Sequence, residues 1–212
     1  EAAKDVTVDT SLLESRLIAG DPALMLELDA RLRARRDVRA FFEANLQLAH
    51  PLPSFNFFTQ IDPIYTHARY LPATKVNLCT IDHAIIGDGS IITQAHIKRC
   101  VVGIRSVLRE GVDLEDVVMM GADYYESEVD FAANAAKGIP NIGIGRNCHF
   151  RTAIIDKNAR IGNNVTLSPV GKPNGHVRDG IAIVDGILVV SKGAIVPAGT
   201  LDMLTAVLQV RT

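Results

Sequence analysis

The sequence predicts a mainly β protein in which a parallel β-helix of hexapeptide repeats follows a short α-helical segment. An aliphatic residue recurs at every sixth position, glycine and asparagine fall between these positions, and aromatic residues are only 5% of a chain that is 48% hydrophobic. A six-residue repeat is typical of a β-helix, whose coils stack one on another. The repeat is clearest in residues 86–97, 102–119, 155–166 and 190–201.

Each coil is expected to contain three short strands of about six residues, joined by tight corners. Small or turn-forming residues suit such corners because they tolerate unusual backbone angles; they are Gly87, Gly89, Gly103, Gly111, Gly162, Asn164, Gly193 and Gly199. The leading aliphatic residues are expected to point into the prism, among them Ile86, Ile92, Val102, Ile155, Ile161 and Val190. The alternative is a β-sandwich, which also contains short apolar runs with glycine.

The first 49 residues predict helices. Ser11 and Glu14 form a capping box for a helix over 12–19, and Asp21-Pro22 opens a second helix over 23–36. A third helix is expected after Asp37. Arginines crowd the end of the second helix, and we interpret them as a solvated helix end, with a nucleic-acid patch as the alternative.

Three further segments complete the predicted organisation. Residues 50–75 form a connector, because its prolines forbid a helix and its aromatic residues need a surface to cover. Residues 76–201 form the β-helix domain, with an insertion at 121–141 that carries a helix signal over 131–137, and a polar loop at 168–180. Residues 202–212 form an apolar tail.

Composition excludes several classes of function. The net charge of −2 provides no global attraction for nucleic acid, and no apolar run is long enough to span a membrane. The acidic start is not a signal peptide, so a cytoplasmic location is expected. Cys79, Cys100 and Cys148 contain no CxxC pair, which favours reduced thiols over a zinc site and leaves a disulfide between subunits open.

No sequence motif indicates a catalytic or metal site. The chain contains no GxxxxGK[ST], GxSxG or HExxH pattern. His96 and His149 are the candidates for a general base if the chain is a hexapeptide acyltransferase, which would deprotonate an acceptor group for transfer from an acyl-CoA. The simpler interpretation is that both histidines are structural or surface residues.

Two lysines suggest an anion-binding site. Lys157 and Lys192 each occupy the third place of a hexad, so they are expected at equivalent corners of the prism. Stacked coils about 4.8 Å apart would bring both ammonium groups to one ridge. With Arg69 nearby, they would bind a phosphate-bearing ligand through charge-assisted hydrogen bonds. The alternative is that these lysines are simply solvated.

Several strings in residues 38–201 identify a resemblance to a known family. They include Pro63 to Pro72, Val101 to Ser106, the Met-Gly-Ala-Asp-Tyr-Tyr-Glu string at 120–126, and the Ile-Ile-Asp-Lys-Asn-Ala-Arg-Ile-Gly string at 154–162. With Phe41 to Leu46, these strings resemble the C-terminal part of ADP-glucose pyrophosphorylase (glucose-1-phosphate adenylyltransferase) and cover about three quarters of the chain. Residues 1–36 resemble nothing in that family.

The resemblance implies a left-handed β-helix that packs against a catalytic domain, builds the oligomer and helps to form an effector site. It implies that Lys157 and Lys192 bind sugar phosphate or phosphoglycerate activators, and that Asp156 and Arg69 belong to the same anion pocket, where phosphate inhibits. It also implies a plastid location if the source is a plant.

The family's catalytic parts are missing from this sequence. The glycine-rich GGxGTRLxPLT loop is absent, and so are the lysine that grips glucose 1-phosphate and the aspartates that hold magnesium. We therefore expect a regulatory and oligomerisation module that has no cofactor or catalytic residue of its own, while the complete enzyme uses magnesium. A hexapeptide acyltransferase and a purely structural oligomerisation domain remain the alternatives.

Overall fold

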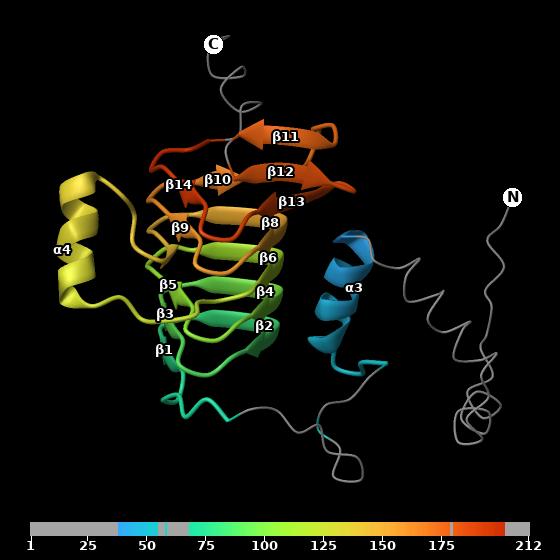
Figure 1. Ribbon diagram of the computed structural model, residues 1–212. Coiled ribbons are helices and arrows are strands. Elements are labelled where there is room, and N and C mark those ends of the chain that lie inside the picture. The colour runs from blue at the N-terminus through green and yellow to red at the C-terminus, as the bar shows by residue number, and fades with distance from the viewer. Residues whose placement is uncertain (1–37, 55–57, 59–67, 179, 202–212) are drawn as a thin grey trace, which may run out of the picture. The chain divides into compact units, whose positions relative to one another are not determined.

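The computed structural model describes residues 38–54, 58, 68–178 and 180–201 (Figure 1). The chain divides into two units, residues 1–41 and 42–212. The third predicted helix is present as α3 (Val38–Leu48), in which Phe42 is buried. The helices expected over 12–19 and 23–36, and the tail over 202–212, lie outside the described residues. The predicted boundaries at 49 and 75 stay predictions.

The strands of the second unit stack in parallel to form a β-helix (Figure 1). One sheet has the strand order β1-β3-β5-β7-β9-β14. Its strands are β1 (Lys75–Asn77), β3 (Ile91–Thr93), β5 (Val107–Leu108), β7 (Gly143–Ile144), β9 (Arg160–Ile161) and β14 (Ile195–Val196).

The second sheet has the order β11-β12-β13-β8-β6-β4-β2, with β10 paired to β8. Its long strands are β2 (Thr80–Ile86), β4 (His96–Val102), β6 (Asp113–Met119) and β8 (His149–Ile155). Each has a positive φ at its fourth residue, namely His83, Arg99, Asp116 and Thr152. The strand therefore bends in the middle and lies on two faces of the prism, so each coil has three faces.

The register of the long strands gives the coil length. Ile86 pairs with Val102, and Val102 pairs with Met119, so these coils take 16 and 17 residues. These lengths are one or two residues shorter than three strands of six residues. One corner of each coil lies within a long strand, at non-glycine residues such as Arg99.

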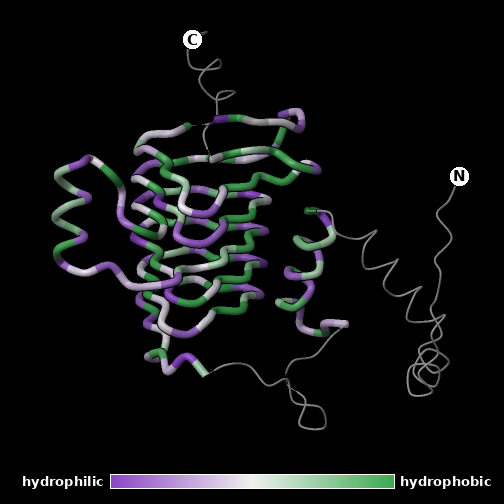
Figure 2. Tube along the Cα trace, viewed as in Figure 1, coloured by the Kyte–Doolittle hydropathy of each residue, from purple (hydrophilic) through white to green (hydrophobic). Residues whose placement is uncertain are grey.

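The core consists of aliphatic side chains stacked inside the prism, and hydrophobic and hydrophilic residues alternate along the coils (Figure 2). The six residues predicted to point inward all belong to this core: Ile92, Val102, Ile155, Ile161 and Val190 are buried, and Ile86 packs against them half-buried. Cys100 and Cys148 are buried free thiols, and burial raises the pKa of Cys100 to about 12.

The insertion between β6 and β7 contains α4 (Glu128–Lys137), which begins three residues before the predicted helix signal. Ser127 and Asp130 form a capping box, and Gly138 ends the helix in the left-handed conformation. Glu126 fixes the insertion to the coils. Its carboxylate forms an ion pair with Arg160 at 2.6 Å and accepts a hydrogen bond from the Ile142 backbone N–H at 2.7 Å.

The segment predicted as a polar loop at 168–180 is partly a hairpin. β11 (Gly175–Arg178), β12 (Ile181–Val184) and β13 (Ile187–Val190) pair antiparallel, whereas β13 returns to parallel pairing with β8. β10 (Thr166–Leu167) precedes this hairpin. Within the described part of the chain, no helix is both long and apolar enough to cross a membrane.

Candidate anion-binding site

Lys157 and Lys192 lie on one ridge of the prism, in the turns that follow β8 and β13. Ile155 pairs with Val190, so the two lysines, each two residues further on, occupy equivalent places in successive coils. The Gly193 N–H donates to the Lys157 carbonyl at 2.9 Å, which stacks the two turns directly. The predicted equivalence of the two corners is therefore seen in the structure.

The two lysine side chains converge on the carboxylate of Asp123. Lys157 Nζ lies 2.8 Å from Asp123 Oδ1, and Lys192 Nζ lies 3.3 Å from Asp123 Oδ2. Lys157 is about one-third exposed and Lys192 is 61% exposed, so a small ligand can reach both ammonium groups from solvent. Two cations therefore surround the Asp123 carboxylate.

Asn158 holds Asp123 in place. The Asp123 N–H donates to Asn158 Oδ1 at 2.8 Å, and Asn158 Nδ2 donates to Asp123 Oδ2 at 3.0 Å. The hydrogen bond from Lys157, with those from Asn158 and Lys192, holds the pKa of Asp123 well below its usual range. Asp123 is therefore ionised at neutral pH.

The other two predicted site residues are Asp156 and Arg69, and their positions differ from those of the two lysines. Asp156 Oδ1 accepts a hydrogen bond from the Lys157 backbone N–H at 2.6 Å, so its carboxylate orders the turn. Arg69 is exposed and precedes β1, which is four strands from β9, or about 19 Å along the stack. Among the described residues, no hydrogen bond or ion pair joins Arg69 to either lysine.

Sequence reasoning from the lysine spacing missed Asp123 and Asn158. Asp123 comes from the preceding coil, 34 residues before Lys157, near the start of the insertion. The signal that marks Asp123 is the Met-Gly-Ala-Asp string at 120–123, one of the strings that carry the family resemblance.

His96 and His149, the candidates for a general base, flank Asp113 on the outer surface of β4, β6 and β8. His96 Nδ1 lies 3.1 Å from Asp113 Oδ1, and His149 Nδ1 lies 3.5 Å from Asp113 Oδ2. Arg151 also donates to Asp113 at 2.6 Å. The two histidines and Arg151 thus lie around one carboxylate at the surface.

No group of His, Cys, Asp and Glu suits a metal ion in the part of the chain that the structure describes.

Comparison with known proteins identifies the family of this chain. Residues 69–201 match the GLGC left-handed parallel beta-helix domain. The chain is 45% identical over 166 residues to the "Glucose-1-phosphate adenylyltransferase small subunit, chloroplastic/amyloplastic" of Triticum aestivum. The aligned region is 77% of this chain but 35% of the wheat protein, so the chain spans about a third of the length of that relative.

These matches confirm the left-handed β-helix and the resemblance to the C-terminal region of ADP-glucose pyrophosphorylase. The chain belongs to the family of the GLGC left-handed parallel β-helix domain.

Proposed function

We propose that this chain is the regulatory and assembly region of a glucose-1-phosphate adenylyltransferase, which joins ATP and glucose 1-phosphate to give ADP-glucose and pyrophosphate. In this proposal the ridge formed by Lys157 and Lys192 binds phosphate, sugar phosphate or phosphoglycerate effectors. The supporting observation is the convergence of both ammonium groups on the Asp123 carboxylate, at 2.8 and 3.3 Å.

A phosphate group bound here would receive hydrogen bonds from both lysines, which are already held in one place. Charge-assisted hydrogen bonds of this kind are stronger than neutral ones. The Asp123 carboxylate competes with such a ligand, because both carry negative charge and both use the same donors. We therefore expect weak, roughly millimolar binding, about 4 kcal/mol, that falls as salt rises.

The remaining parts of the proposal rest on the family. The wheat relative is titled a small subunit, which supports assembly of this chain with a catalytic domain and with homo- or hetero-oligomer subunits. That title places the wheat protein in chloroplasts or amyloplasts, and we extend this location to the present chain if its source is a plant. Magnesium would belong to the catalytic part of the complete enzyme. The family favours this proposal over the acyltransferase alternative.

Phosphorus NMR and calorimetry with inorganic phosphate and a sugar phosphate test the effector site. Lys157→Ala and Lys192→Ala should each weaken binding about fivefold, or ~1 kcal/mol, because each removes one exposed cation. Asp123→Asn should strengthen binding, because it removes the competing charge. Lys137→Ala, at the end of α4, is the matched control and should bind like the parent. If all four variants gave the same titration, the effector site would be refuted.

A further inference from the structure

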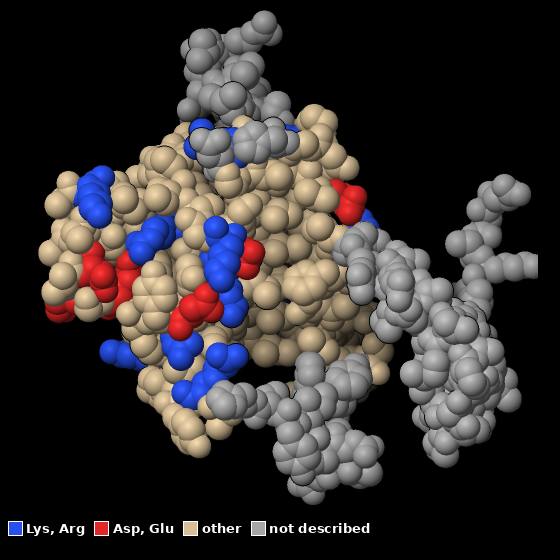
Figure 3. Space-filling view, viewed as in Figure 1, with Lys and Arg blue, Asp and Glu red and all other residues tan. Residues whose placement is uncertain are grey.

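Two adjoining cavities form a groove beside α4, and Arg109 and Phe131 line both of them. The cavities have volumes of about 360 and 370 Å³, which suits a small molecule. The first has an apolar wall from α4 and the segment after it, formed by Phe131, Ala135, Ile139 and Pro140, and its floor includes Gly145, Ile161 and Gly162. Basic and acidic side chains gather over the stacked strands beside α4 (Figure 3).

Arg109 differs from the arginines around it. Arg146 and Arg160 each bind a carboxylate, and Arg105 donates to the Ala122 carbonyl and lies over the Tyr125 ring. Within the described residues, the side chain of Arg109 has neither a hydrogen-bond nor an ion-pair partner, although it is half-buried. Its guanidinium can donate five hydrogen bonds and always carries a charge.

The acidic residues in the groove are committed to other cations. Glu110 Oε2 lies 2.9 Å from Arg146 Nε, and the almost fully buried Glu126 carboxylate binds Arg160 and the Ile142 N–H. No other Asp or Glu lines either cavity. Glu110 also feels the charge of Arg109 at longer range, but neither carboxylate forms a hydrogen bond or an ion pair with the Arg109 guanidinium, whose donors are left for a ligand.

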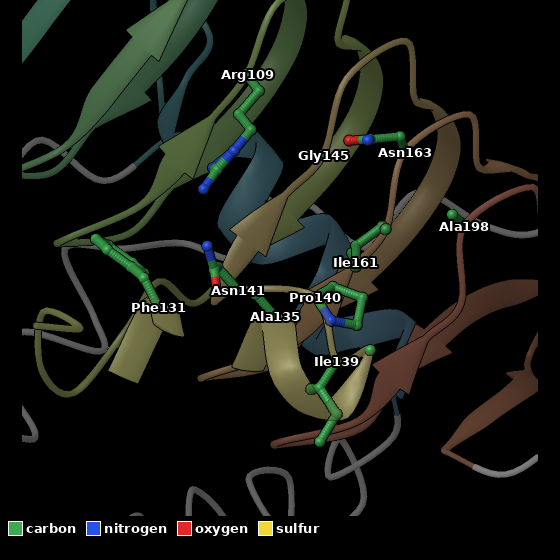
Figure 4. Close-up of a pocket in the computed structure, with 12 residues that line it drawn as sticks. Arg109, Phe131, Ala135, Ile139, Pro140, Asn141, Gly145, Ile161, Asn163 and Ala198 are labelled. Atoms are coloured by element: carbon green, nitrogen blue, oxygen red, sulfur yellow. The ribbon is translucent and has the colours of Figure 1, made fainter. Parts of the chain in front are cut away.

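Asn141 adds a second donor to the groove. Its Oδ1 accepts a hydrogen bond from Asn134 at 3.0 Å, which leaves its side-chain N–H₂ turned to the cavity. In Figure 4 the ends of the Arg109 and Asn141 side chains point toward one another, and the Phe131 ring lies beside them. The cavity thus offers donors at one end and apolar surface at the other.

We propose that this groove binds a small organic anion with a flat apolar body, a phosphate ester or a carboxylate. The anionic group accepts hydrogen bonds from Arg109 and Asn141, and the flat body packs against Phe131 and Pro140. Arginine forms two parallel hydrogen bonds to such anions, which fixes their orientation. This site is separate from the Lys157–Lys192 ridge, and it does not depend on the function proposed for that ridge.

Amide NMR of the full chain, titrated with phenyl phosphate and with benzoate, tests the proposal. At least one probe should shift the amides of Phe131, Asn141 and Gly145 in a saturable way, and the stronger probe identifies the preferred anion. Inorganic phosphate and phenol should bind the groove at least about tenfold more weakly, because each lacks one half of the recognised ligand.

Variants locate the binding to the groove. Arg109→Gln should weaken binding at least about tenfold, Arg109→Lys should fall between Gln and the parent, and Phe131→Ala should weaken it about fivefold. Lys157→Ala and Lys137→Gln should bind like the parent. The proposal fails if neither probe shifts these amides, if phosphate alone binds equally well, or if Arg109→Gln retains the parent affinity. It also fails if Lys157→Ala loses the binding, because the probe would then occupy the ridge.

Discussion

Asp113 shows how a single carboxylate organises the outer surface of the long strands. It accepts hydrogen bonds from Arg151 and His96, with His149 close by. Burial opposes its ionisation, but these hydrogen bonds outweigh burial and lower its pKa to about 2. Because the pKa is lower in the folded state, ionised Asp113 stabilises the fold above about pH 4 and loses this effect as the pH falls toward 2.

We therefore predict that Asp113→Asn destabilises the protein by about 1 kcal/mol at pH 5, after allowing for solvent screening. At pH 2.5 the difference in the free energy of unfolding between the variant and the parent should be smaller, because the parent carboxylate is then partly protonated. Urea unfolding at both pH values measures this. Asp88→Asn, at an exposed position after β2, is a control for loss of one carboxylate elsewhere. An equal difference at the two pH values would contradict the assigned role of Asp113.

The residues that could not be predicted are those that depend on the stacking of distant coils. The inward aliphatic residues follow from the six-residue repeat, and the lysine pair follows from equivalent places in two hexads. Asp123 completes the site from another coil, and no local spacing indicates that contact. The positive φ of Arg99 and Asp116 was also unexpected, because glycine and asparagine were the predicted corner residues.

At the scale of elements, the coil register can be tested by placing a charge inside the prism. Ile161 in β9 is 1% exposed, whereas Ile195 in the paired strand β14 is 46% exposed. Ile161→Asp should cost more than about 4 kcal/mol, because an unpaired carboxylate would be buried among aliphatic side chains. Ile195→Asp introduces the same residue on the outer surface and should cost far less. Thermal unfolding measures the loss of stability in each variant. Equal melting temperatures for the two variants would show that the register is wrong.

The insertion helix α4 depends on its capping box more than on packing, because none of its residues is buried. Ser127→Ala removes the side-chain oxygen that accepts from the Asp130 N–H, and should destabilise the helix by about 1 kcal/mol. Amide hydrogen exchange should quicken in α4 and remain unchanged in β4 and β6. Faster exchange throughout the prism would mean that the insertion supports the coils, contrary to this prediction.

The elements also show where sequence reasoning reaches its limit. Repeated strands are predictable because every coil presents the same pattern to its neighbours. The hairpin of β11 and β12 interrupts that pattern. The prolines before it and its glycines indicated a loop, and its antiparallel pairing depends on the edge that β13 provides. The start of α4 was missed because Ser127 and Asp130, rather than the alanines, determine it.

At the scale of the whole molecule, the 212-residue chain should bind anions but make no ADP-glucose. Transfer between phosphates requires groups that cradle the triphosphate and stabilise the charge that develops on it, commonly with a metal ion. The sequence contains no GGxGTRLxPLT loop, and no cluster among the described residues suits a metal. We expect purified chain, ATP, glucose 1-phosphate and magnesium to release no more pyrophosphate than a reaction without protein. A full-length adenylyltransferase assayed in parallel should release pyrophosphate and confirm the conditions. Any release by the chain that exceeds the background and disappears without glucose 1-phosphate would show that the β-helix itself performs the chemistry.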